Sequence, residues 1–192
     1  MKRFIFGIVG LFALFSLSSC GYNTMVKLDE NVQSKWAEVE NAYQRRADLI
    51  PNLVNTVKGA ANFEQETLTQ VIEARSKATS INIDASELTP EAIKQFEDAQ
   101  NALSGSLSRL MAVAENYPQL RATENFQALQ AQLEGTENRI SVARRNFNEA
   151  TQQYNSTIRA FPNNLMAGIF GFKAKGYFQS SAGADKAPTV SF

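Results

Sequence analysis

Large apolar residues recur at every seventh position along the C-terminal half of the chain. The stripe consists of Phe126, Leu133, Ile140, Phe147, Tyr154 and Phe161. A second seam, three positions further on in each repeat, holds mostly small residues: Leu129, Thr136, Ala143, Ala150 and Thr157. Large side chains on one seam and small ones on the other suit the close packing of a left-handed helical bundle. The pattern predicts a long helix over residues 122–161.

A similar stripe lies upstream, at Ile93, Phe96, Leu103, Leu110 and Tyr117. It begins just after Thr89, which can cap a helix, and Pro90, which is favoured at the first helical position. These signals predict a helix over residues 90–115. No run of alternating β-branched residues occurs between residues 24 and 161, so strands are not expected there.

The segment 24–80 carries helical apolar spacing, but Pro51 interrupts it. Its apolar positions are Leu28, Val32, Trp36, Val39, Tyr43, Leu53, Val57, Ala61, Leu68, Val71 and Ala78. One unbroken helix here would be about 85 Å long, far longer than the helices it would pack against. Proline removes a helical hydrogen bond and restricts the preceding residue, so we expect a turn at Pro51 that separates two helices. The alternative is a continuous helix with a kink at Pro51.

These patterns together predict an all-α fold. The expected architecture is an antiparallel up-down-up-down four-helix bundle of long helices over residues 20–161, joined by short loops. A short C-terminal apolar segment and tail, residues 162–192, follows it.

The N-terminus has the three parts of a bacterial export signal: Lys2 and Arg3, an apolar run over residues 4–17, and small residues. The run is shorter than the roughly 20 residues that a membrane-spanning helix needs. Leu17-Ser18-Ser19-Cys20 resembles a lipobox, and Cys20 is the only cysteine in the chain. We therefore expect residues 1–19 to be a cleaved signal peptide and Cys20 to be lipidated. The alternative is an ordinary signal peptide followed by an incidental cysteine.

Composition narrows the function classes. The chain has 19 basic and 19 acidic residues, so no general basic field favours nucleic acid. It has no histidine, which excludes serine-histidine and cysteine-histidine nucleophile pairs and histidine metal sites. A carboxylate metal site is the enzyme alternative, with candidate ligands at Glu64, Glu66, Glu73, Glu134 and Glu137, but ferritin-like sites also require histidines. We expect a non-catalytic protein without a cofactor.

A bundle anchored at Cys20 would bring the turn at Pro51 and residues 115–118 together at the membrane-distal end. The polar residues expected to meet there are Arg45, Arg46, Asp48, Asn52, Glu115, Asn116 and Tyr117. They can lock two turns together by satisfying free backbone groups at helix ends, or form a recognition patch for a partner domain or an anionic ligand. The two interpretations are compatible.

The segment 163–178 is more apolar than a solvated tail and would lie at the same end as Cys20. The residues expected to contact the membrane are Ile169, Phe170, Phe172, Lys173, Lys175 and Phe178. Aromatic rings with interspersed lysines suit a bilayer interface. The alternative is a hydrophobic cap that covers the open end of the core.

Three blocks of sequence resemble the LemA family of bacterial membrane-anchored proteins. They begin with Arg45-Arg46-Ala47-Asp48-Leu49-Ile50-Pro51-Asn52-Leu53-Val54, continue with Glu115-Asn116-Tyr117-Pro118, and end with Glu134-Gly135-Thr136-Glu137-Asn138-Arg139-Ile140. A terminal Pro188-x-Val190-x-Phe192 also fits. The resemblance implies a helical bundle at the cell envelope with no established catalysis. Many relatives are held by an N-terminal transmembrane helix, whereas this chain has the lipobox-like sequence.

The leading hypothesis from sequence is a lipid-anchored scaffold or adaptor that binds another envelope protein outside the cytoplasm. The alternative is a helical bundle that binds a small molecule or a lipid between its helices. Neither hypothesis names the partner or the ligand.

Overall fold

The computed structural model describes residues 2–59 and 63–179, with side chains from residue 21 onward. Its helices are α1 (Lys2–Lys58), α2 (Gln65–Ser80), α3 (Pro90–Ala114), α4 (Pro118–Arg121), α5 (Glu124–Arg159) and α6 (Asn163–Phe170). The described residues contain no strand. The prediction of an all-α fold is confirmed.

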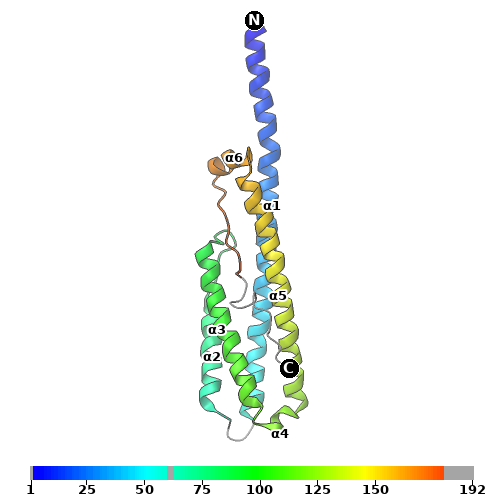
Figure 1. Ribbon diagram of the computed structural model, residues 1–192, viewed down its shortest axis with the longest axis vertical. Coiled ribbons are helices and arrows are strands. Elements are labelled where there is room, and N and C mark those ends of the chain that lie inside the picture. The colour runs from blue at the N-terminus through cyan, green and yellow to red at the C-terminus, as the bar shows by residue number, and fades with distance from the viewer. Residues whose placement is uncertain (1, 60–62, 180–192) are drawn as a thin grey trace, which may run out of the picture.

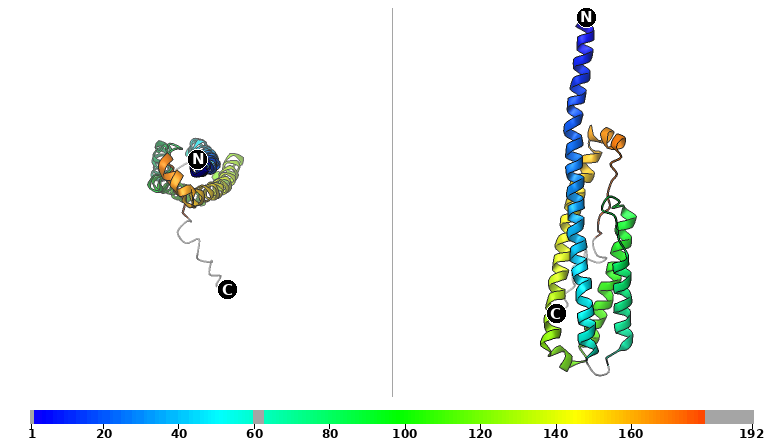
Figure 2. Two further views of the ribbon diagram at one scale, coloured as in Figure 1. Left: turned by 90° about the horizontal axis from the view of Figure 1, so that it is seen from above. Right: turned by 180° about the vertical axis from the view of Figure 1, so that it is seen from behind.

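The helices form an elongated rod. Helices α1 and α5 pack along each other over most of the length, and α2 and α3 form a shorter hairpin beside them (Figures 1 and 2). The N-terminal part of α1 extends beyond the other helices at the end where α6 lies. We call this end, with Gly21, Tyr22 and α6, the proximal end. The opposite end, with residues 56–59, 63–64 and 115–125, is the distal end.

Helix α1 continues through Pro51 to Lys58, so the expected turn at Pro51 is wrong. In an α-helix the N–H of residue 51 would donate to the carbonyl of Ala47, and proline has no N–H. Instead, Nε of Arg75 on α2 donates to this carbonyl at 2.9 Å. A side chain from the neighbouring helix thus supplies a hydrogen bond that proline cannot make.

The other long helices begin and end close to their predicted bounds. The side chain of Thr89 accepts a hydrogen bond from the amide of Ala92 at 3.2 Å, as expected of an N-cap residue. Thr123 caps α5 in the same way. The stripe of α5 is buried from Phe126 to Tyr154, whereas Phe161 is exposed because α5 ends at Arg159.

The buried apolar side chains form two clusters along the rod. The distal cluster joins α1, α2, α3 and α5 through residues such as Leu53, Leu68, Leu103 and Phe126. The proximal cluster is rich in aromatic rings and is centred on Trp36, which lies 5.1 Å from Phe96 and 5.6 Å from Phe147, measured between ring centroids. Helix α5 contributes residues to both clusters, so it links the two halves of the core.

Candidate functional site

Arg46 lies between the two halves of the core, with 1% of its surface exposed. Its Nη1 donates to Oγ of Ser104 at 2.6 Å and to Oε1 of Glu137 at 2.7 Å. Its Nη2 donates to the side-chain and backbone oxygens of Gln100, at 2.7 and 3.2 Å. The guanidinium group also lies 5.0 Å from the ring centroid of Tyr43. One arginine therefore ties α1 to α3 and α5.

The polar residues expected to meet at the distal end do not form one cluster. Arg45, Asp48 and Asn52 are exposed on α1, and Arg46 is buried. All four belong to the helix before its end at Lys58, whereas Glu115, Asn116 and Tyr117 follow α3 at the distal end. The expectation that they lock two turns is wrong, because the turn at Pro51 on which it depended does not exist. Arg46 instead locks helices together along the rod.

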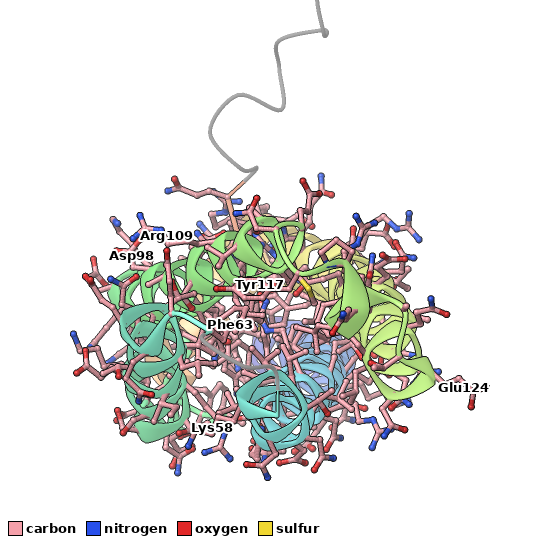
Figure 3. The ribbon with its side chains drawn as sticks, turned by 90° about the horizontal axis from the view of Figure 1, so that it is seen from below. Lys58, Phe63, Asp98, Arg109, Tyr117 and Glu124 are labelled. Carbon is pink, nitrogen blue, oxygen red and sulfur yellow. The ribbon has the colours of Figure 1, made fainter. Side chains whose placement is uncertain are left out.

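The distal end has an aromatic centre and a charged rim. The ring of Tyr117 lies 5.0 Å from that of Phe63, between centroids. Seen along the rod, these two side chains lie toward the middle, and Lys58, Arg109 and Glu124 lie around them (Figure 3). Of the seven polar residues that were expected to meet at this end, Glu115, Asn116 and Tyr117 belong to it.

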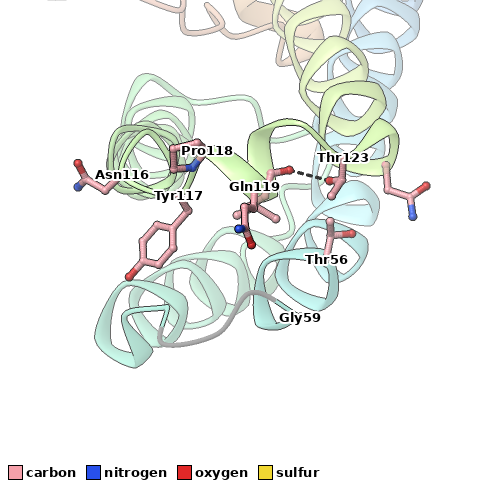
Figure 4. A pocket seen from close by; sticks show the side chains of 9 residues that line it. Thr56, Gly59, Asn116, Tyr117, Pro118, Gln119 and Thr123 are labelled. Carbon is pink, nitrogen blue, oxygen red and sulfur yellow. Dashed lines mark hydrogen bonds between the residues drawn. The ribbon is translucent and has the colours of Figure 1, made fainter.

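A cavity of about 920 Å³ opens at the distal end, between the last turn of α1 and the segment that contains α4 (Figure 4). Its lining residues carry amide, hydroxyl and apolar groups, without a charged side chain: Thr56, Gly59, Asn116, Tyr117, Pro118, Gln119, Leu120, Thr123 and Asn125. The hydroxyl of Thr123 donates to the carbonyl of Leu120 at 2.7 Å, which fixes one wall. Of these residues, the sequence analysis singled out Asn116 and Tyr117 as candidate site residues at the distal end.

The chain after α6 forms an extended segment, residues 172–179, which we call the C-terminal strap. Asn155 donates from Nδ2 to the carbonyl of Lys175 at 2.8 Å and accepts from its amide at 2.9 Å. Asn148 holds Phe178 in the same way, with both distances at 2.9 Å. The ring of Phe178 is buried in the proximal cluster, stacked 6.1 Å from that of Trp36. The strap is therefore part of the core.

The strap also buries a lysine. Nζ of Lys175 lies 2.8 Å from Oδ1 of Asp29 and 5.4 Å from the ring centroid of Tyr154. The hydroxyl of Tyr154 donates to the carbonyl of Lys173 at 3.0 Å. Burial, together with the nearby carboxylate of Asp29, raises the pKa of Tyr154 to about 12. These contacts attach the strap to α1 and α5.

The residues that were expected to contact a membrane differ in their exposure. Lys175 and Phe178 are buried within the bundle, so this prediction is wrong for both. Phe172 is half-buried, with its ring 5.8 Å from that of Tyr22 between centroids. Ile169, Phe170 and Lys173 are exposed, and for them membrane contact stays a prediction. The ring of Phe178 inserts among the side chains of the proximal cluster, against Trp36, Phe96 and Phe147.

Helix α6 lies against α1 directly beside the predicted lipidation site. A Cβ atom added at Gly21 would lie 2.7 Å from Oδ1 of Asn163, so the two helices approach closely there. The side chains of residues 1–20, Cys20 included, lie outside the described part of the structure, as do residues 188–192. Lipidation of Cys20 and removal of residues 1–19 therefore stay predictions.

Side chains are described for residues 21–59 and 63–179. In this part of the chain, no three acidic or cysteine side chains come together as a metal site requires. From Gly21 onward, no described stretch of helix combines the length and the apolar character needed to cross a membrane. Glu137, one of the candidate metal ligands, is instead paired with Arg46.

Comparison with known proteins gives a family match that covers most of the chain. The model of the LemA family matches residues 35–192. The chain is 27% identical to magnetosome protein MamQ 1 of Paramagnetospirillum magneticum, over 94% of this chain and 73% of that protein. It is 26% identical to protein LemA of Metamycoplasma hominis, over 83% of this chain and 69% of that protein.

Proposed function

Because the chain belongs to the LemA family, we propose that it is a lipid-anchored scaffold or adaptor of the cell envelope that binds another envelope protein. The family and its MamQ and LemA relatives favour a membrane-associated, non-enzymatic envelope protein. The lipobox-like sequence at Leu17–Cys20 supports anchoring by a lipid on Cys20. The absence of histidine from the sequence supports a role other than catalysis.

The observation that carries the proposal is the separation of the two ends of the rod. Gly21 follows Cys20 at the proximal end, and α1 reaches the distal end 37 residues later, at Lys58. At a rise of about 1.5 Å per residue this places the distal end roughly 55 Å from the anchor. If α1, α2, α3 and α5 form one antiparallel up-down-up-down bundle, the rod holds its distal surface well away from the lipid.

Contacts across the helices favour a rigid spacer. The four hydrogen bonds of Arg46 connect α1 with α3 and α5. Nearer the proximal end, Asn148 and Asn155 attach the strap to α5 through four more. A scaffold needs this property, because a bending spacer would not present a partner at a defined height.

Photocrosslinking in cells tests the proposal. A photoreactive amino acid is placed at Asn116 or Gln119 on the distal end, and at Ile72 on the side of the rod as a matched exposed control. We expect the distal positions to capture one envelope protein that Ile72 does not capture. The proposal fails if the distal positions and Ile72 give the same background pattern.

The distal cavity favours a second candidate function, the binding of a small molecule. Its volume of about 920 Å³ is within the usual range of ligand pockets. Native mass spectrometry of protein purified under mild conditions should then show an additional mass, and Thr123→Trp, which fills the cavity, should remove it. A spectrum with the unliganded mass alone would count against this candidate.

A further inference from the structure

The most exposed large apolar side chains of the described residues gather around α6. Phe161, Leu165, Ile169 and Phe170 have exposed fractions of 80%, 59%, 73% and 53%. We call these four the α6 patch. The opposite side of α6 is also apolar, because Ala167 is buried and Met166 packs against the proximal cluster. Helix α6 therefore cannot bury the patch by rotating.

The patch lies next to the predicted anchor. The ring centroid of Phe170 is 4.8 Å from that of Tyr22, which follows Cys20 by two residues. Along a helix, two residues correspond to about 3 Å. Helix α6 runs across the end of the rod, at a large angle to α1 (Figures 1 and 2). With the rod upright on a bilayer, α6 would lie in the plane of the headgroups, a layer about 5–8 Å thick.

Along its own segment of the chain the patch is flanked by basic groups, whereas Asp29 and Glu87 of other elements line a cavity beside Phe170 and Lys173. The sequence has no acidic residue between Glu149 and Asp185. Within that interval Arg159 and Lys173 are exposed, whereas Lys175 is neutralised by Asp29. Exposed apolar side chains with flanking basic groups are the features of an interfacial helix that binds anionic lipid.

We propose that the α6 patch, together with Tyr22, Arg159 and Lys173, is a second membrane contact that inserts into the headgroup layer of an anionic bilayer. The apolar side chains leave water, and the two basic groups meet lipid phosphates. This contact would hold the rod upright beside its covalent anchor. The inference rests on the proposed function only for the position of the bilayer at Cys20.

The test measures the depth of single positions in the full-length protein. The protein is reconstituted in phosphatidylcholine vesicles that contain phosphatidylglycerol, and Ile169→Cys carries a fluorescent label. Ile72→Cys is the matched control, because Ile72 is an exposed isoleucine on the side of the rod. The unsubstituted protein, treated with the label in parallel, corrects for any label on Cys20.

We expect quenching of the label at position 169 by aqueous iodide to be reduced about fivefold relative to position 72, as for a group withdrawn into the headgroup layer. Spin-labelled lipids should quench position 169 and leave position 72 unaffected. Changing Arg159 and Lys173 to Gln should shift the label at position 169 toward water, and only in vesicles with anionic lipid.

Two outcomes would overturn the inference. Equal iodide quenching at positions 169 and 72 would show that the patch faces water. Protection from iodide without quenching by spin-labelled lipids would show that protein, for example a second copy of the chain, covers the patch. In either case flotation of the protein with the vesicles would still report on the anchor, so failure of this contact is separate from failure of the anchored scaffold.

Discussion

The hydrogen bond from Arg75 to the carbonyl of Ala47 should contribute much more to the free energy of unfolding when residue 51 is proline than when it is alanine. Proline inside a helix costs about 3 kcal/mol relative to alanine. Replacing Pro51 with Ala restores the N–H that can donate to this carbonyl, so the substitution should raise the free energy of unfolding by about 1–3 kcal/mol. The side chain of Pro51 is exposed, so the change creates no cavity.

Arg75→Met keeps the aliphatic part of the side chain and removes the donor. In the protein that has Pro51, Arg75→Met leaves the carbonyl of buried Ala47 without the hydrogen bond from Nε. This loss should lower the free energy of unfolding by about 1.5–3 kcal/mol, as for a hydrogen bond from a charged group. In the Pro51→Ala background the new N–H satisfies the same carbonyl, so Arg75→Met should cost under about 1 kcal/mol.

Denaturant unfolding of the four proteins of this double-mutant cycle, followed by helical circular dichroism, measures the coupling between the two positions. We expect a coupling free energy of about 1–2 kcal/mol. The reasoning is refuted if Arg75→Met costs the same in both backgrounds. A Pro51→Ala protein less stable than the parent would likewise refute it.

Three further predictions concern single residues. Gly105→Ala should raise the free energy of unfolding by about 0.5–1 kcal/mol, because the new Cβ meets nothing within 4 Å; an unchanged or lower melting temperature would contradict this. Asn155→Ala should lower the free energy of unfolding by about 2–4 kcal/mol in denaturant unfolding, because it leaves the buried amide and carbonyl of Lys175 unpaired. Asn138→Ala, at an exposed position of the same helix, should change it little. Equal losses for the two variants would refute a role for the strap in stability. Because the pKa of Tyr154 is about 12 when folded and near 10 when unfolded, the folded state holds its proton longer, and stability should fall as the pH rises from 10 to 12. Tyr154→Phe should be less stable at neutral pH, having lost the bond to Lys173, but should show a shallower alkaline decline; parallel pH curves would contradict this.

Repeating apolar patterns were sufficient to predict the helices that bury a regular stripe. The seven-residue stripe from Phe126 to Tyr154 predicted α5, and the cap at Thr89 predicted the start of α3. The continuation of α1 through Pro51 could not be predicted in this way. It depends on Arg75, 28 residues from the carbonyl that it satisfies, and local propensity contains no information about such a distant donor.

The strap was missed for a related reason. Asn148 and Asn155 resemble solvent-exposed polar residues, although each directly follows a large stripe residue, Phe147 or Tyr154. That seven-residue spacing is the one signal that could have found them. The side chains of the two asparagines, and not a neighbouring strand, make hydrogen bonds with the backbone of this extended segment. Patterns of strand pairing therefore could not predict where the strap lies.

The wrong membrane assignment of Lys175 and Phe178 follows from the same omission. Composition correctly marked the segment 163–178 as too apolar for a solvated tail. It could not separate α6, whose side chains Ile169 and Phe170 remain exposed, from the strap, in which Lys175, Gly176 and Phe178 are buried. Only the pairing of the strap with α5 makes that distinction.

The most direct test of the account as a whole is the intact mass of the protein extracted from the membrane fraction of cells that express the full-length chain. Anchoring at Cys20 predicts a mature chain of 173 residues that begins at Cys20 and carries the added mass of acyl chains. Cys20→Ser should abolish both the cleavage and the added mass. A chain that begins at Met1, or an unmodified cysteine in membrane-bound protein, would contradict the lipid-anchored scaffold.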